Sequence, residues 1–90
     1  MNVAVLIQVA LLAQSAASEG DLLSRAKLAY DRVDFGASLA LLRPVPDPSA
    51  AALELMGRSQ FMLHDFKGAT ETFERAIQKD PNRASAYHWL

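Results

Sequence analysis

Apolar and small side chains recur at helical spacing through the second half of the chain. Leu53, Met56, Gly57 and Phe61 follow the i, i+3, i+4, i+8 spacing of one helix face. A second run keeps the same period, with charged residues between the apolar ones. The positions expected to be buried in this second helix are Phe66, Ala69, Phe73, Ala76 and Ile77. The pattern therefore predicts two amphipathic helices in succession.

Polar residues and prolines mark the ends of these helices. Ser49 follows Pro48 and is placed to cap the first helix, and Asp65 is placed to cap the second. Pro81 ends the second helix because a proline disfavours helical geometry at the residue before it. With a turn at His64 and Asp65, the two helices form an antiparallel hairpin.

A glycine inside the first helix indicates how closely the two helices approach. Gly57 costs about 0.5–1 kcal/mol relative to alanine in a helix interior. Such a cost persists where a neighbouring helix must come close, and Ala69 and Ala76 on the partner helix support the same interpretation. We therefore expect close packing at Gly57, with Phe66 and Phe73 filling the space around these small residues.

The same pattern occurs earlier in the chain and begins again at its end. A shift of 31 residues places Leu22 on Leu53, and a further shift of 34 places Leu53 on Tyr87. The earlier unit has Ala26 where the later one has Gly57, and its second helix is shorter. We therefore predict an all-α fold of tandem antiparallel helix hairpins. Its units are a degenerate repeat at 18–48, a full repeat at 49–83 and the start of a third repeat at 84–90.

Seven residues at these offsets resemble the tetratricopeptide repeat consensus. They are Leu53, Gly57, Phe66, Ala69, Phe73, Ala76 and Pro81. The resemblance is clear over 49–90 and degenerate over 19–48, and Gln60 stands where the family usually has a tyrosine. It implies a fragment of a right-handed α-solenoid. In that family a concave groove, lined by the first helix of each repeat, holds a segment of another protein.

On this resemblance, the residues that face the groove come from the first helix of each unit. They are Lys27, Tyr30 and Asp31 in the first unit, Glu54, Arg58, Phe61 and Met62 in the second, and Ser85 and His88 in the third. A specialised groove of the family clamps a carboxylate with several Lys, Arg and Asn side chains. Lys27 and Arg58 have no asparagine partners here, so we do not predict that mode.

Composition and motifs argue against several other functions. The 90 residues are 51% hydrophobic and 21% charged, with a net charge of −1 and no cysteine. No basic cluster is present, so a nucleic-acid partner is not expected. His64 and His88 do not form a metal-spaced pair, and no phosphate-binding loop or nucleophile motif occurs. We therefore expect no metal, no cofactor and no enzymatic activity.

The first 17 residues differ from the rest of the chain. Residues 3–13 are apolar except for Gln8, small residues follow, and the first charged side chain is Glu19. This layout is typical of a secretory signal cut before Ser18, although it has no basic start. We expect export to the periplasm or cell envelope. The alternative is an N-terminal apolar helix packed on the domain of a cytoplasmic protein, and an intact Met1 in the mature protein would favour it.

The sequence thus favours a scaffold that binds a peptide or a partner subunit in its groove. The alternative is an accessory repeat region of a larger enzyme or secretion machine whose catalytic part lies beyond residue 90. The chain ends at Trp89 and Leu90 without a polar cap, where repeat proteins usually need one. We therefore expect Trp89 to pack into a further repeat, and this uncapped end leaves self-association open.

Overall fold

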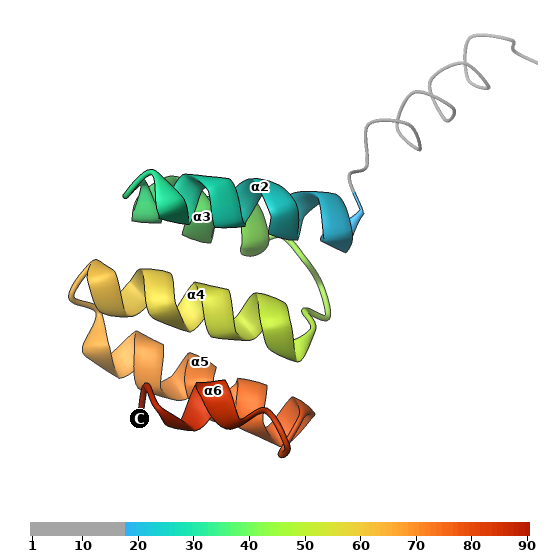
Figure 1. Cartoon of the computed structure of the whole chain (residues 1–90), viewed down its shortest axis with the longest axis vertical. Helices are drawn as coiled ribbons and strands as arrows, with labels where there is room; N and C mark the ends of the chain where they lie inside the picture. Colours follow the sequence, from blue (N-terminus) through green and yellow to red (C-terminus); the bar gives the residue numbers. More distant parts are fainter. Residues whose placement is uncertain (1–17) are drawn as a thin grey trace, which may run out of the picture.

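Residues 18–90 are described by a computed structural model, and within this range the chain is entirely helical (Figure 1). The five helices are α2 (Glu19–Asp31), α3 (Phe35–Leu42), α4 (Ala50–Met62), α5 (Phe66–Lys79) and α6 (Ala84–Tyr87). No strand occurs between residues 18 and 90, which agrees with the predicted all-α class. The expected signal sequence at 1–17 lies outside the described residues.

The helices form two antiparallel pairs, followed by the short α6. α2 packs on α3, α4 packs on α5, and α3 also packs on α4, which joins the two pairs. In Figure 1, α2, α4 and α6 form the near face, while α3 and α5 lie behind them. The side chains that α2 and α4 turn toward the viewer therefore share one surface.

Each of the first four helices begins at a side-chain cap. Asp21 N–H donates to Ser18 Oγ, Ala37 N–H to Asp34 Oδ1, Ala52 N–H to Ser49 Oγ and Gly68 N–H to Asp65 Oδ1, over 3.0–3.2 Å. The predicted caps at Ser49 and Asp65 are confirmed. Such a cap contributes about 1 kcal/mol to helix stability because it satisfies a backbone donor that has no partner within the helix.

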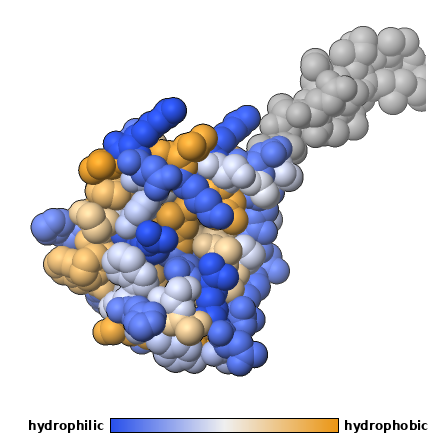
Figure 2. All heavy atoms as spheres, in the orientation of Figure 1, coloured by the Kyte–Doolittle hydropathy of each residue, from blue (hydrophilic) through white to orange (hydrophobic). Residues whose placement is uncertain are grey.

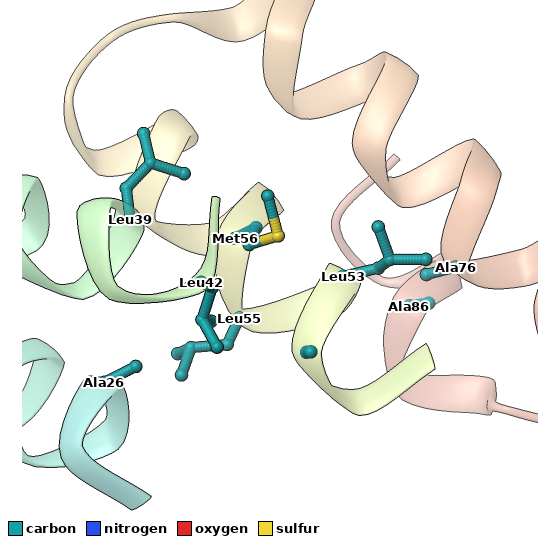
Figure 3. Packing of buried hydrophobic residues seen from close by; sticks show 9 residues of the cluster. Ala26, Leu39, Leu42, Leu53, Leu55, Met56, Ala76 and Ala86 are labelled. Atoms are coloured by element: carbon teal, nitrogen blue, oxygen red, sulfur yellow. The ribbon is translucent and has the colours of Figure 1, made fainter. Parts of the chain in front are cut away.

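Small side chains alternate with larger ones through the core. Figure 3 shows Leu42 and Leu55 side by side near Ala26, and Leu53 directed toward Ala76 and Ala86. All of these residues are buried. The core therefore runs continuously from α2 through α3, α4 and α5 to α6.

The predicted close approach at Gly57 is confirmed. A Cβ atom added at Gly57 would lie 2.6 Å from Phe73 Cε1, and Phe73 is fully buried. Ala69 and Ala76 are buried as well. The ring of Phe73 thus occupies the space that any side chain at position 57 would need.

The prediction that Phe66 is buried was wrong, because the residue is 52% exposed to solvent. Phe66 is the first residue of α5 and projects at the hairpin turn, where the helices end and offer no further partner. Its ring makes an edge contact with Phe61, with centroids 5.1 Å apart. Helical period correctly gives the face of α5 on which Phe66 lies, but it does not show that the packed interface ends before this residue.

The turns of both hairpins have the same backbone structure. After α2, Asp34 N–H donates to Ala29 O and Val33 N–H donates to Tyr30 O. After α4, the equivalent bonds run from Asp65 to Gln60 and from His64 to Phe61. This pattern of a 6→1 and a 5→2 hydrogen bond is the Schellman motif, which needs a left-handed residue where glycine is usually found. Val33 (φ 63°) and His64 (φ 67°) occupy that position.

We expect Val33→Gly to raise the free energy of unfolding by about 0.5–1 kcal/mol. The left-handed conformation is unfavourable for a β-branched residue, and glycine removes that cost while losing little packing, since Val33 is 72% exposed. Urea unfolding followed by circular dichroism measures the change. Arg32→Gly is the matched control: its φ is −85°, so glycine should destabilise there. Equal effects at both positions would contradict this account of strain.

A basic side chain at the end of α5 secures the loop before α4. Lys79 Nζ donates to Pro48 O over 2.7 Å and also to the Asp47 carboxylate. The hydrogen bond from Lys79 to the Asp47 carboxylate, together with the positive charge of Lys79, holds the pKa of Asp47 below its ordinary value. Because the pKa of Asp47 is lower in the folded state, its ion pair with Lys79 contributes to stability at neutral pH. This contribution to stability is lost as the pH falls through the folded-state pKa. The loop is thus tied to the following hairpin.

Candidate functional site

Five of the nine residues predicted to face a groove line one shared cavity of about 230 Å³. Lys27, Tyr30 and Asp31 have i, i+3, i+4 spacing on α2, and Glu54 and Arg58 have i, i+4 spacing on α4, so each set lies on one helix face. Because α2 and α4 lie side by side on the near face, the two sets meet between them (Figure 1). We call this cavity the α2–α4 groove.

Arg58 occupies the centre of the groove between two aromatic rings. Its Cζ atom lies 4.6 Å from the centroid of the Tyr30 ring and 5.3 Å from that of Trp89. A guanidinium over an aromatic face is attracted by about 0.5–2 kcal/mol, depending on how far it is desolvated. Arg58 Nε is buried and has no hydrogen-bond partner. The rings therefore hold a cation in place, and it retains unused capacity to donate hydrogen bonds.

Glu54 connects the groove to α6. It is 6% exposed, and its Oε2 atom accepts hydrogen bonds from Arg83 Nε and from Ser85 Oγ, the latter over 2.8 Å. A buried carboxylate needs such partners, because an unpaired buried charge is strongly destabilising. The cluster thus fixes the start of α6 against α4 and provides a polar wall for the groove.

Trp89 is half-buried and packs against the second hairpin. Its ring stacks on Phe73 with centroids 5.8 Å apart and meets the edge of Phe61 at 5.6 Å. Together with Arg58, these residues surround it on the existing hairpin. The sequence alone did not reveal this arrangement because α6 turns back toward α4 only through the cluster at Glu54.

The other four predicted residues do not line the α2–α4 groove. Ser85 lies at its wall through its bond to Glu54, and Phe61 lies beyond Arg58 against Trp89. Met62, at the end of α4, is 41% exposed, and His88 is exposed just after α6. Met62 and His88 were predicted to face the groove, but the structure places both on the surface outside the cavity.

Sequence reasoning missed three lining residues, Ala51, Leu55 and Arg83. Ala51 and Leu55 come from α4 and supply an apolar floor. Arg83 comes from the link between α5 and α6. The available signal was the position of Arg83 directly before the third unit. The acidic residue that it meets is Glu54, on the first helix of the second unit. The groove therefore combines an apolar floor with both signs of charge.

Figure 2 shows polar colours across most of the face formed by α2, α4 and α6, with paler and apolar areas between them. A second, larger cavity of about 680 Å³ lies between α2, α3 and the loop before α4. Its lining is mainly apolar and includes Leu22, Leu41 and Val45. Glu19, Arg25 and Asp47 are its charged members, and none of the predicted groove residues lines it.

Between residues 18 and 90, no group of three or more metal-binding side chains is clustered. No helix in this part of the chain is long and apolar enough to cross a membrane. Comparisons with protein-family models, with curated proteins and with solved structures found no match. The geometry of the groove is therefore the basis for proposing a function.

Proposed function

We propose that the protein is a binding scaffold that holds a segment of another polypeptide in the α2–α4 groove. The observation that carries this proposal is the convergence of Tyr30, Glu54 and Arg58, from two helices, on one cavity. Arg58 is fixed in advance by Tyr30 and Trp89. A group that is ordered before binding loses little entropy when a ligand arrives, which favours affinity.

The chemistry of the lining suits a peptide. A polypeptide presents amide donors and carbonyl acceptors at regular intervals beside apolar side chains. The groove offers donors from Lys27 and Arg58, acceptors from Asp31 and Glu54, and an apolar floor at Leu55. A cavity of about 230 Å³ has room for a side chain or two, and not for a folded domain.

The arrangement of the helices supports the same proposal. Two hairpins with matching caps and matching Schellman turns are consistent with tandem tetratricopeptide-like repeats stacked as a right-handed solenoid. The proposal includes export to the periplasm or cell envelope, which the apolar run before Ser18 supports. Repeat scaffolds of this kind expose a concave surface that binds extended or helical segments of a partner.

We expect Arg58→Glu to weaken peptide binding at least about tenfold. The substitution reverses the charge at the groove centre and removes its donors. A library of random short peptides displayed on phage, selected on the full chain, supplies the ligands. Their dissociation constants for the wild type and the variant are then measured by fluorescence anisotropy.

Arg75→Glu is the matched control, because it makes the same charge change at an exposed position on α5, away from the groove. It should leave the dissociation constants within about twofold of the wild type. Peptides that bind both variants equally well would contradict the groove assignment. Circular dichroism spectra of both variants establish that each remains helical.

A further inference from the structure

Most of the exposed large apolar side chains between residues 18 and 90 lie at one edge of the molecule. Six of them lie at the hairpin turns, where α2 and α4 end and α5 begins: Leu28, Val33, Phe61, Met62, Leu63 and Phe66. We call this surface the turn edge. Figure 2 shows apolar colours along the left side, where the two turns lie in Figure 1. Apolar side chains scattered singly are normal, but a gathered set marks an interaction surface.

Val33 shows that this surface is not a by-product of folding. It is 72% exposed, so it contributes little to the core, and it adopts a left-handed conformation that glycine would adopt at lower cost. A side chain that is both strained and exposed to water is unfavourable in the isolated chain. Such an outlier supports the hypothesis of a role outside the fold.

Aromatic contacts make the second-unit part of the turn edge continuous. The ring of Phe66 lies 5.1 Å from that of Phe61 and 5.6 Å from that of His64. In the first unit, Tyr30 and Phe35 make the equivalent edge contact at 5.1 Å. The two turns are linked through Arg58, which lies over Tyr30. The edge is thus one surface with the same construction in each unit.

The area is close to what a dimer of this size requires. A half-exposed apolar side chain of this kind presents about 100 Å² to water, so six present about 600 Å². A standard interface buries about 800 Å² on each partner, including its polar rim. Two turn edges placed together bury both apolar surfaces in a single contact, which a two-fold arrangement achieves with one kind of interface.

Charges around the turn edge are mixed, with a small acidic excess from the exposed Asp31 at the end of α2. Arg32 and Asp34 flank Val33, and Asp65 and Lys67 flank Phe66, all of them exposed. An anionic lipid surface attracts an excess of basic residues, which is absent here. A two-fold axis that sets the first unit of one copy against the second unit of the other brings opposite charges together. The rim is therefore complementary to itself.

We propose that the turn edge is the contact surface between two copies of this chain. None of the six residues that define the turn edge lines the α2–α4 groove, so the dimer presents two grooves. It also differs from self-association through the C-terminal end, because the residues that carry it belong to the hairpin turns. The second copy buries the exposed apolar side chains of both turns and surrounds them with paired charges.

The test measures the oligomeric state of the full chain by sedimentation velocity over a range of concentrations. We expect a dimer whose dissociation constant rises at least a hundredfold in Leu63→Glu and in Phe66→Glu, since each buries an unpaired charge against apolar side chains of the other copy. Both positions are half-exposed in the single chain, so folding should persist. Tyr87→Glu, an equally exposed position on α6, is the matched control and should dimerise normally.

Val33→Gly is a further test variant, in which a loss of dimerisation would not result from unfolding. It should unfold at a higher temperature than the wild type and yet dimerise about tenfold more weakly, because each copy loses a buried side chain. The proposal is overturned by a chain that stays monomeric, or that sediments with vesicles of phosphatidylcholine instead of dimerising. It is equally overturned by a dimer that Tyr87→Glu breaks and that Leu63→Glu and Val33→Gly leave intact.

Discussion

Replacing Phe73 with alanine should lower the free energy of unfolding by about 3–5 kcal/mol. Phe73 is fully buried, lies against Gly57 and stacks on Trp89. Its removal leaves a cavity that glycine on the facing helix cannot fill. A domain of this length has a total stability of about 5–13 kcal/mol, so a large part of the native margin disappears. Urea unfolding followed by circular dichroism measures the loss.

Phe66→Ala is the matched control for this prediction. The same atoms are removed from the same helix, but Phe66 is half-exposed and loses only part of the burial term. We expect a cost below about 1.5 kcal/mol. If the two alanine variants unfold at the same urea concentration, Phe73 is not the residue that joins α4, α5 and α6.

Gly57→Ala should destabilise the protein by about 1–3 kcal/mol, although alanine ordinarily favours a helix over glycine. The added methyl group would lie 2.6 Å from Phe73 Cε1, and a buried ring cannot move aside without disturbing its neighbours. Overpacking therefore outweighs the gain of about 0.5–1 kcal/mol in helix propensity. The midpoint of thermal unfolding measures the result.

Two further variants make this prediction specific. Gly36→Ala adds the same methyl group in α3, where nothing lies within 4 Å, so it should stabilise the chain. Adding Phe73→Leu to Gly57→Ala should recover part of the loss, because the smaller side chain makes room. Gains at both glycines, or no coupling between positions 57 and 73, would be incompatible with the packing described for α4 and α5.

Local chemistry made the helices and their ends predictable from the sequence. The side chains of Ser49 and Asp65 accept hydrogen bonds from backbone N–H groups three residues further along the chain. The close packing at Gly57 was predicted from the helical spacing of small residues on the two helices. The shared groove of Lys27, Tyr30 and Arg58 was expected from the resemblance to tetratricopeptide repeats, which implies that the first helices of successive units lie side by side. Each of these features needs only the neighbouring residues of the chain or one adjacent helix.

Features that depend on where a helix packs were not predictable in the same way. Phe66 has the correct period for burial, but the interface ends before it. Arg83 and Trp89 join the groove because a bond to Glu54, 29 residues away in the case of Arg83, turns α6 back over α4. Val33 adopts a left-handed conformation that its residue type disfavours. Tertiary contacts decide the positions of Phe66, Arg83 and Trp89, whereas the conformation of Val33 follows from the local Schellman turn, where glycine is the usual residue.

The cluster at Glu54 has a consequence for exchanging or recombining the repeats. Because Ser85 of the third unit completes the hydrogen bonds of Glu54 in the second unit, and Trp89 of the third unit covers Arg58, neither unit carries a finished recognition surface by itself. A chimaera that transplants residues 49–83 alone would keep Arg83 beside Glu54, but it would lose the hydrogen bond from Ser85 and the ring of Trp89 over Arg58. The transferable module runs from the middle of one repeat into the next.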